Sequence, residues 1–251
     1  MRGLEGMGVA VTGGGSGIGR AAAKRLAEEG CVVAILDLNR QTGEETAALC
    51  GKGARPYQVD ITQYDQVRRA AEQFEAEGTP VTGLVNVAGY DSPNWFLDTD
   101  QAHWDKHLAV NLYGALVTSH VFVRGMVERR RGRVVNVASG SGLVGTGVAA
   151  VYSAAKGGLI AFTKALAREV AKHGVILNTV APGPTDTPMF RGHLATTPVA
   201  GVTAEGIARA IPMGRLAQPE DYAGTIAYLL SDDAGFMTGQ TISISGGLTM
   251  T

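Results

Sequence analysis

The sequence has little cysteine, no clustered metal ligands and almost no excess charge of either sign. Among its 251 residues only Cys31 and Cys50 are cysteines, and neither belongs to a CxxC pair or a Cys/His cluster. A structural zinc site is therefore not expected, and reduced thiols in a cytoplasmic protein are a simpler interpretation than one disulfide. The five histidines lack HExxH-type spacing, so no metal is predicted.

The charge and the apolar pattern exclude two further classes of partner. Formal net charge is −1, so no overall field attracts nucleic acid or an anionic membrane. The first six residues contain no apolar h-region, and a signal peptide is not expected there. The longest uncharged stretch, 134–155, is interrupted by four glycines and three serines, which is too polar for a membrane span. We expect neither nucleic acid nor a membrane as partner.

Short apolar runs alternate instead with longer helical patterns along the whole chain. The expected strands are residues 7–12, 31–36, 55–59, 83–87, 133–138, 175–180 and 241–245. The expected helices are residues 17–29, 41–49, 63–77 (capped by Thr62), 101–128, 151–172 and 219–230. The strands read as continuous apolar runs, as in a parallel sheet that is buried on both faces.

Strand–helix alternation of this kind predicts the α/β class, as a doubly wound parallel sheet (Rossmann fold) with helices on both faces. No change of composition marks a linker, so residues 1–251 are expected to form a single domain. The proline-punctuated segment 182–215 reads as irregular. Because it is long and carries apolar residues, we expect a substrate lid at about 184–215.

A glycine-rich stretch, Thr12-Gly13-Gly14-Gly15-Ser16-Gly17-Ile18-Gly19, lies between the first strand and the first helix. Glycines allow a sharp turn there and let backbone N–H groups approach a pyrophosphate at the helix N-terminus. The spacing is G-x-x-x-G-x-G, and no Gly-Lys-Ser/Thr follows, which disfavours a P-loop. Dinucleotide binding is predicted for Gly13, Ser16, Gly17, Ile18 and Gly19, with a plain glycine turn as the alternative.

Two aspartates follow the next strands. Asp37 closes the second strand, where an acidic residue accepts hydrogen bonds from the adenosine ribose and repels a 2′-phosphate. This favours NAD over NADP, although Arg40 lies near and a helix cap or turn would also explain Asp37. Asp60 ends the third strand, as an adenine contact or a cap. Leu38 and Ile61, beside these aspartates, are predicted to line the same cofactor site.

Polar and small residues also end the central strands. Asn86-Val87-Ala88-Gly89 ends the fourth strand, and Ser139 follows the fifth. Ligands of open α/β sheets bind outside the carboxyl ends of strands, so these side chains and the two aspartates are expected to share one edge. Asn111 and Gly114 are poor helix formers inside the expected helix 101–128, which indicates a kink or a functional role.

Tyr152 and Lys156 are four residues apart in the expected helix 151–172. This spacing places the two side chains on one helix face, with Cβ atoms about 5–6 Å apart. A nearby cation favours a phenolate and brings the tyrosine pKa toward the range useful for proton transfer. The pair alone would also suit a solvated helix face.

Two other interpretations fit less well. No Gly-x-Ser-x-Gly elbow exists for a serine hydrolase. Arg129-Arg130-Arg131 at a helix end is read as a solvated face, with a phosphate-bearing substrate as the minority interpretation.

Taken together these motifs resemble the short-chain dehydrogenase/reductase family over essentially the whole chain. Thr12–Gly19 is similar to TGxxxGIG, and Asn86–Gly89 to NNAG with Val87 in place of the second Asn. The remaining matches are Asn111, Ser139, the YxxxK pair Tyr152/Lys156, and Pro182-Gly183 with downstream Thr187. Ser245-Gly246-Gly247 departs from the usual Asp-Gly-Gly.

The resemblance implies an NAD-dependent oxidoreductase that interconverts a secondary alcohol and a ketone. Tyr152 would be the general acid/base, Lys156 would lower its pKa and bind the nicotinamide ribose, and Ser139 would hydrogen-bond the substrate oxygen. Asn111 would hold a water of a proton relay. Pro182, Gly183, Thr185 and Thr187 would fix the nicotinamide. A homotetramer built on helices 101–128 and 151–172 is also implied.

The substrate is predicted less sharply. Runs such as Ala88-Gly89-Tyr90-Asp91 are similar to those of dehydrogenases of 2-hydroxycyclohexanecarboxyl-CoA and of 3-oxoacyl thioester reductases. A 3-hydroxyacyl or alicyclic 2-hydroxycarboxyl thioester is therefore expected, with a 3-oxoacyl-[acyl-carrier-protein] reductase-like activity as the alternative. The expected substrate wall is Tyr90, Trp95, Ser141, Leu143, Val144 and segment 189–199. A non-catalytic NAD-binding sensor is the competing class, although it would be free to lose Tyr152 or Lys156.

Overall fold

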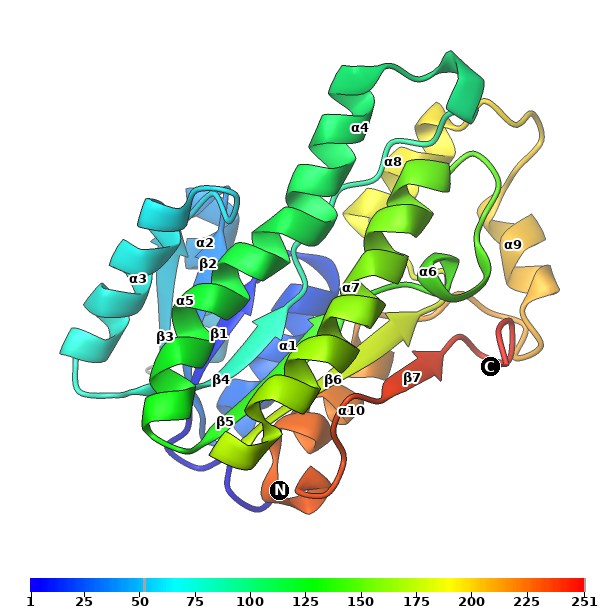
Figure 1. The fold of residues 1–251 in the computed structure, drawn as a ribbon. Coiled ribbons are helices and arrows are strands. Elements are labelled where there is room, and N and C mark those ends of the chain that lie inside the picture. Colours follow the sequence, from blue (N-terminus) through cyan, green and yellow to red (C-terminus); the bar gives the residue numbers. More distant parts are fainter. Residues whose placement is uncertain (52, 251) are drawn as a thin grey trace.

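A seven-stranded parallel sheet organises the chain. The computed structural model describes residues 1–51 and 53–250. The strands are β1 (Gly8–Thr12), β2 (Val32–Asp37), β3 (Ala54–Gln58), β4 (Val81–Asn86), β5 (Gly132–Val137), β6 (Val175–Pro182) and β7 (Thr241–Ile244). Their order is β3-β2-β1-β4-β5-β6-β7, and every pairing is parallel. The predicted doubly wound sheet is confirmed (Figure 1).

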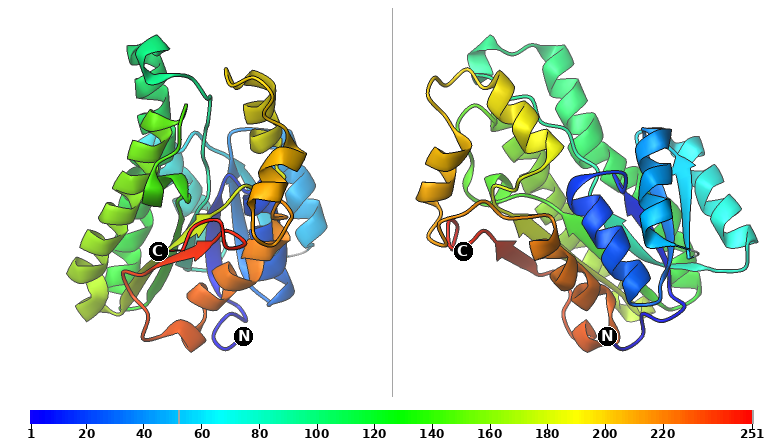
Figure 2. Two further views of the ribbon diagram at one scale, coloured as in Figure 1. Left: turned by 90° about the vertical axis from the view of Figure 1, so that its right-hand side faces the viewer. Right: turned by 180° about the vertical axis from the view of Figure 1, so that it is seen from behind.

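Helices cover both faces of this sheet. The principal helices are α1 (Gly17–Glu28), α2 (Arg40–Cys50), α3 (Tyr64–Ala76), α4 (Gln101–Leu108), α5 (Gly114–Glu128), α7 (Ala150–Val170) and α10 (Glu220–Leu230). Figure 2 shows α1, α2 and α10 from behind, on the face opposite to α3, α5 and α7. Strand residues alternate between the two faces, so Val9 and Val11 pack with α1 and α10, whereas Ala10 packs on the α3 and α5 side.

The two cores are apolar and deeply buried. On one face Leu26 of α1 and Ile226 of α10 are 0 % exposed, and on the other face Phe74 of α3 and Met126 of α5 are 0 % exposed. Full burial of one such side chain contributes about 1.5–3 kcal/mol. The edge strand β3 differs from the expected continuous apolar run: its sequence ARPYQ is partly exposed, and it has only one neighbouring strand.

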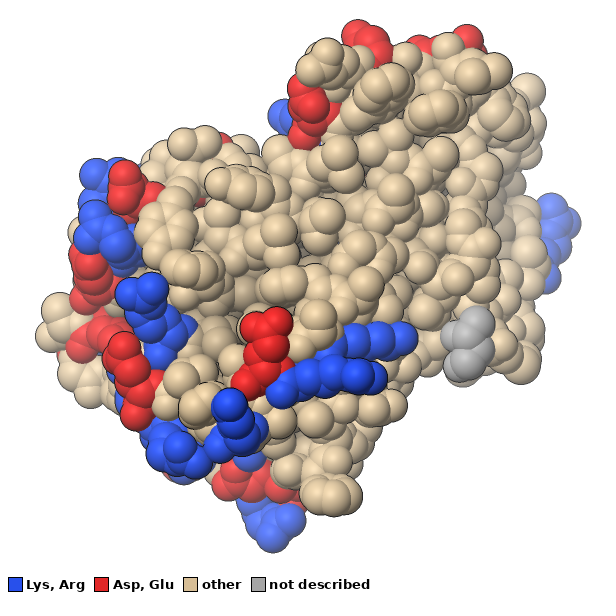
Figure 3. Space-filling model, in the orientation of Figure 1, with Lys and Arg blue, Asp and Glu red and all other residues tan. Residues whose placement is uncertain are grey.

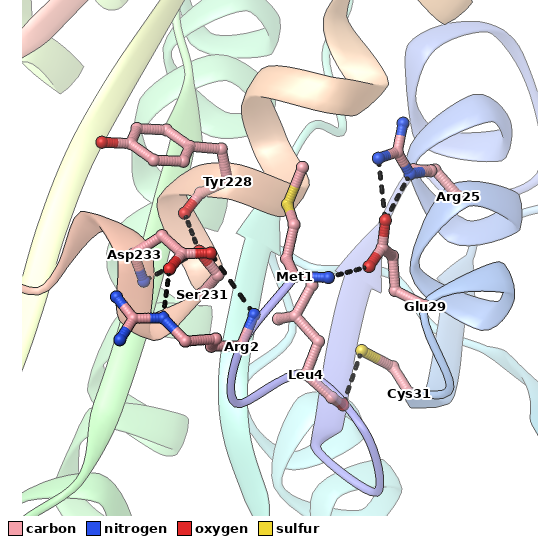
Figure 4. A network of polar contacts seen from close by, with 9 residues as sticks. All are labelled: Met1, Arg2, Leu4, Arg25, Glu29, Cys31, Tyr228, Ser231 and Asp233. Atoms are coloured by element: carbon pink, nitrogen blue, oxygen red, sulfur yellow. Dashed lines mark hydrogen bonds and ion pairs between the residues drawn. The ribbon is translucent and has the colours of Figure 1, made fainter.

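The first residues of the chain are tied to the C-terminal ends of α1 and α10. The α-amino group of Met1 pairs with Glu29 at the end of α1. The guanidinium of Arg2 pairs with Asp233 in the 3-10 turn Asp232–Ala234 that follows α10 (Figure 4). These contacts lie at the end of the molecule where the strands begin, away from their carboxyl ends.

The expected bounds of the strands, and of most helices, match the structure to within two residues at each end. The cap of α3 is a correction, because Gln63 and not Thr62 precedes the helix and makes no side-chain cap. Thr62 instead donates its hydroxyl hydrogen to Oδ1 of Asp60, at 2.7 Å. The expected helix 101–128 is continuous but contains a π-helical segment, Ala109–Tyr113, between α4 and α5.

The segment expected to be irregular, 182–215, contains two helices, α8 (Pro188–Thr196) and α9 (Ala204–Ala210). The prolines misled the prediction, because Pro188 occupies the first helical position, where a missing N–H costs nothing. Thr187 and Thr203 cap the two helices through their side-chain oxygens. A short helix, α6 (Ser141–Val144), was not predicted either.

None of the helices described in residues 1–51 and 53–250 is long and apolar enough to cross a membrane.

Candidate active site

A cavity of about 890 Å³ opens at the carboxyl ends of the strands. It is lined by the glycine-rich loop, by the residues that follow β2, β4, β5 and β6, and by α7 and α8. The predicted site residues on its wall are Gly13, Ser16, Gly17, Ile18, Gly19, Asp37, Leu38, Asp60, Ile61, Ala88, Gly89, Ser139, Tyr152, Lys156, Pro182, Gly183, Thr185 and Thr187. The structure therefore brings together all of the predicted residues except Asn86 and Asn111 in one wall.

The glycine-rich loop is shaped so that the N-terminus of α1 opens into this cavity. Gly13 and Gly17 adopt φ values of 62° and 49°, the left-handed region that favours glycine. A Cβ on Gly19 would lie 2.1 Å from the carbonyl oxygen of Gly13, so this position requires glycine for close packing. Ser16 makes no side-chain cap, and the first turn of α1 holds no acidic residue. The N–H groups of that turn can therefore receive an anion.

Asp37 is held rigidly at the end of β2. Its Oδ2 accepts a hydrogen bond from the Gly15 N–H at 2.8 Å, and its Oδ1 accepts one from the Asn39 N–H at 2.9 Å. Gly15 permits this contact, because a Cβ there would lie 2.7 Å from Oδ2. Arg40, the nearby cation, is exposed and pairs with Glu44 on its own helix at 2.7 Å. The carboxylate thus dominates this end of the cavity.

Asn86 lies in the protein interior and not on the cavity wall. Its amide nitrogen donates to Asn136 at 2.9 Å and to Ser119 at 3.3 Å, and its oxygen accepts from Thr118 at 2.7 Å. Asn136 is the register partner of Asn86 on β5 and in turn donates to Thr163 of α7. The Asn86 side chain therefore joins the sheet to α5 and, through Asn136, to α7.

Asn111 occupies the middle of the π-helical segment. Its Oδ1 accepts from the Tyr90 N–H at 3.0 Å, and its Nδ2 donates to the carbonyl oxygens of Tyr90 and His107. Such segments are rare and frequently lie at functional sites. A Cβ on Gly89 would lie 3.1 Å from Oδ1 of Asn111 and 3.7 Å from Nζ of Lys156, so the amide lies close behind the cavity wall near Lys156.

Tyr152 and Lys156 share one face of α7, as predicted. The Lys156 Nζ lies 5.7 Å from the centre of the Tyr152 ring and donates to the carbonyl oxygen of Val137 at 2.9 Å. Ser139, two residues beyond β5, lies on the same wall, and its Oγ accepts from the Ser141 N–H. A hydroxyl, a phenol and an amine therefore converge from two elements.

The pKa of Tyr152 shifts in the direction opposite to the predicted one. Burial raises it above the ordinary value, the Asp91 carboxylate raises it further, and the Ser139 side chain lowers it. Burial also lowers the pKa of the Lys156 ammonium, to about 8. Burial therefore favours the protonated phenol, and the effect of Lys156 on the pKa of Tyr152 stays a prediction.

The remaining wall departs from the expected substrate side. Tyr90, Ser141 and Val144 line the cavity, but Leu143 and Trp95 do not. Asp91 and His193 line it and form an ion pair, which the sequence did not predict because the two residues are 102 positions apart. Adjacency of Asp91 to the small residues Ala88 and Gly89 was the only signal for it in the sequence.

Tyr222 is a further buried residue near the cavity that the sequence analysis did not identify. It lies in α10 with 0 % exposure, and its hydroxyl is 2.7 Å from Oγ1 of Thr185. Thr185 Oγ1 also donates to the carbonyl oxygen of Gly183. Tyr222 therefore supports the loop after β6 from below the cavity.

Within residues 1–51 and 53–250, no cluster of His, Cys, Asp or Glu is arranged to hold a metal ion.

Known proteins share both the sequence and the architecture. A family profile described as Enoyl-(Acyl carrier protein) reductase matches residues 13–249. The chain is 38% identical to 2-(S)-hydroxypropyl-CoM dehydrogenase 3 of Xanthobacter autotrophicus, over 96% of each chain. It is 37% identical to (3R)-3-hydroxyacyl-CoA dehydrogenase of Homo sapiens, over 96% of this chain and 94% of that one.

Among solved structures, 3-ketoacyl-(acyl-carrier-protein) reductase from Brucella melitensis, complexed with NADH, matches with a TM-score of 0.91. Its identity is 29%, over 98% of this chain and 100% of that chain. The match over nearly the full length of named dehydrogenases and reductases agrees with the motifs on the cavity wall. The chain belongs to the short-chain dehydrogenase/reductase family and is an oxidoreductase that acts on a CH–OH group.

Proposed function

We propose that this chain is an NAD-dependent dehydrogenase that interconverts a secondary alcohol and a ketone, with Tyr152 as the general acid/base. The observation that carries the proposal is the convergence of Ser139, Tyr152 and Lys156 on the wall that also holds the glycine-rich loop and Asp37. Bound NAD would accept the hydride from the carbinol carbon, or NADH would return it. The chain has to bind the cofactor and to move one proton.

The residues fit a dinucleotide by their own chemistry. The open N-terminus of α1 suits a pyrophosphate, and the fixed carboxylate of Asp37 suits ribose hydroxyls. A cavity of about 890 Å³ lies in the range of cofactor and ligand pockets, about 300–1,000 Å³. Gly17 lies close to Thr187 on the cavity wall, since a Cβ there would approach Thr187 to 3.2 Å. These features support NAD, and Asp37 argues against a 2′-phosphate.

Each catalytic side chain has a role in the transfer of the proton. The phenol of Tyr152 is protonated in its buried state and can donate to a ketone oxygen during reduction. During oxidation the phenol must first lose its proton, and the ammonium form of Lys156 stabilises the phenolate. Ser139 donates a hydrogen bond to the substrate oxygen on which charge develops. Asn111, behind Gly89, is placed to connect Lys156 with a proton path.

For the substrate we infer a 3-hydroxyacyl or alicyclic 2-hydroxycarboxyl thioester. The relatives named as 3-hydroxyacyl-CoA dehydrogenase and 3-ketoacyl-(acyl-carrier-protein) reductase support thioester chemistry. A 3-oxoacyl-[acyl-carrier-protein] reductase-like activity is the second candidate, and it rests on the same relatives. A non-catalytic sensor is disfavoured, because the phenol and the amine both face the cavity.

A homotetramer is also proposed. A groove of about 680 Å³ runs over α5 and α7 and is lined mainly by apolar side chains, among them Tyr113, Leu116, Val123, Phe162 and Leu166. Figure 3 shows few charges on the front of the molecule, where these helices lie, while charged side chains gather near α3 and along the lower edge. Leu116→Asp is expected to reduce the molar mass in solution, as measured by light scattering.

The test of the activity is NADH formation with a panel of secondary alcohols that includes hydroxyacyl thioesters. Tyr152→Phe is expected to lower kcat by about 10²- to 10⁴-fold, as for loss of a general acid/base. Tyr228→Phe is the matched control, because this tyrosine lies in α10, where its hydroxyl contacts Met237. The proposal fails if the unmodified protein turns over no alcohol, or if Tyr152→Phe keeps full activity.

A further inference from the structure

A carboxylate and an imidazole meet over the substrate half of the cavity. Asp91 lies between β4 and α4, and His193 lies in α8. The His193 Nδ1 and the Asp91 Oδ2 are 2.6 Å apart. Both residues line the cavity that holds Ser139 and Tyr152. The pair therefore links the lid helix to the catalytic wall and is itself part of the binding surface.

Burial destabilises the charged form of Asp91, and one of its two carboxylate oxygens has no hydrogen-bond donor among the described residues. Its side chain is 12% exposed. Burial raises its pKa, and the nearby imidazole rings of His107 and His193 lower it. Within the described residues no group donates a hydrogen bond to its Oδ1. A buried carboxylate with one strong partner is poor support for stability, which points to a role in the site.

His107 cannot supply the missing hydrogen bond in the tautomer that its contacts require. Its Nε2 accepts the Ser92 N–H at 3.2 Å, and its Nδ1 lies 2.8 Å from the carbonyl oxygen of His103, to which it donates. Its Nε2 is 3.8 Å from Oδ1 of Asp91, beyond hydrogen-bonding distance. His193 is thus the principal partner of Asp91.

The contact with Asp91 fixes how His193 presents itself. With Nδ1 committed to the carboxylate, Nε2 is the ring nitrogen left for a ligand, and no described residue hydrogen-bonds to it. The distance of 2.6 Å is at the short end for N–H···O contacts, as in charge-assisted hydrogen bonds. A carboxylate on one ring nitrogen sets the orientation of the ring and stabilises positive charge when the other nitrogen donates.

His193 is a polar side chain in a part of the wall that is otherwise lined by apolar residues. The other residues of α8 that line the cavity are Pro188, Met189 and Phe190, and Ile207 of α9 lies near them. In such pockets a few placed polar groups determine orientation and specificity. Ser139 and Tyr152 are committed to the reacting oxygen, and His193 is a polar group on the apolar part of the wall that can bind a second oxygen on the substrate.

We propose that His193, ion-paired with Asp91 and therefore carrying a proton on each ring nitrogen, binds the second oxygen of the substrate through its Nε2–H, and that this oxygen is the carbonyl of a 3-hydroxyacyl thioester. The inference rests on the proposed function and adds the group that distinguishes such a thioester from a plain secondary alcohol. His193 is then a specificity-determining residue, and Asp91 is a positioning residue that acts through it.

If the Asp91–His193 contact were only a structural latch between α8 and the β4–α4 segment, a different result would be expected. A latch that only holds the lid in place acts on every substrate. A residue that binds the second oxygen acts on substrates that carry it. Comparing a substrate that has this oxygen with one that lacks it therefore separates the two roles.

The experiment compares kcat/KM for the N-acetylcysteamine thioester of 3-hydroxybutyrate with kcat/KM for 2-pentanol, which lacks the carbonyl. His193→Leu is expected to lower the thioester value roughly 10- to 100-fold, the range for one charged hydrogen bond, and to change the alcohol value less than about threefold. His193→Gln should recover part of the loss, because its amide can donate. Asp91→Asn should give a smaller loss on the thioester than His193→Leu.

Equal losses on the two substrates would establish the latch and overturn the proposal, as would a thioester value that is unchanged in His193→Leu. If the unmodified protein oxidises 2-pentanol but shows no preference for the thioester, the inference fails while the dehydrogenase proposal stands. If it oxidises neither compound, the inference fails, and the full panel of alcohols decides whether the dehydrogenase proposal stands. Melting temperatures of the three variants show whether each remains folded.

Discussion

Replacing Asp37 with asparagine is expected to weaken the discrimination between NAD and NADP. Asparagine keeps the size of the side chain and one acceptor oxygen, which can still receive the Gly15 N–H or the Asn39 N–H. It removes the charge. The substitution therefore tests the charge of the carboxylate, and it also removes one of the two hydrogen bonds that Asp37 accepts from backbone N–H groups.

The expected magnitude follows from two opposing effects. A charged hydrogen bond to a ribose hydroxyl contributes about 1.5–3 kcal/mol, so its loss should lower kcat/KM with NAD by about 10-fold or more. A carboxylate about 4 Å from a 2′-phosphate costs about 4 kcal/mol per pair of unit charges near a protein surface. Removing that repulsion should raise kcat/KM with NADP. Together the NAD/NADP ratio should fall by at least about 100-fold.

Initial rates of reduced cofactor formation with each cofactor, at saturating alcohol, measure this ratio. Asp60→Asn is the matched control: Asp60 lines the same cavity edge, and its Oδ1 accepts from Thr62, so its loss should affect both cofactors alike. A preference of the unmodified protein for NADP would refute the reasoning. So would an Asp37→Asn variant whose ratio stays within about threefold of the original.

Three further outcomes are expected. Asn136→Ala should destabilise the fold by about 1–3 kcal/mol, since it leaves a buried N–H of Asn86 without its acceptor; an unchanged melting temperature would contradict this. Burial lowers the pKa of Lys156 to about 8, so the folded state disfavours its ammonium form. The resulting loss of folding free energy is complete below pH 8. It disappears as the pH rises to 10.5, the pKa of this lysine in the unfolded chain. Lys156→Met should therefore be more stable at pH 7 by about 3 kcal/mol, with a smaller gain at pH 10 in thermal unfolding. Burial raises the pKa of the Cys31 thiol to about 12, and the thiol donates to the carbonyl oxygen of Leu4 (Figure 4). Iodoacetamide at pH 8 should therefore label Cys31 only after unfolding, which mass spectrometry would detect.

Much of the site was predictable because its residues mark strand ends. Apolar runs locate the strands, and a parallel sheet gathers their carboxyl ends at one edge, so Asp37 and Ser139 could be placed together before the structure was known. The glycine-rich loop is also local: its turn and the start of α1 depend on adjacent residues. Local sequence information was sufficient there.

Asn86 shows where that reasoning stops. It ends β4, as predicted, but its side chain joins an interior network with residues 32–50 positions away. Alternation along a strand assigns a face to a side chain but does not say whether a polar partner waits on that face. The raised pKa of Tyr152 could not be predicted for a related reason, because burial depends on the completed fold.

The segment 182–215 shows a second limit. Prolines were read as breaks, whereas Pro188 begins α8 behind the Thr187 cap. Both readings are compatible with the local sequence, and packing over the cavity decides between them. The pairing of Asp91 with His193 depends on that packing as well, so no spacing in the sequence indicates it.

The all-parallel sheet also has a consequence for how the protein assembles. The cavity draws its wall from segments between Gly13 and Thr249, and β1 must pair with β4 before the glycine-rich loop meets Ala88 and Gly89. Such long-range pairings form slowly, because closing a long loop loses conformational entropy before any stabilising contact forms. A partly folded chain therefore holds no complete dinucleotide site. During refolding, dehydrogenase activity should return with the last strand pairings, and added cofactor should stabilise the finished fold without accelerating the steps that precede it.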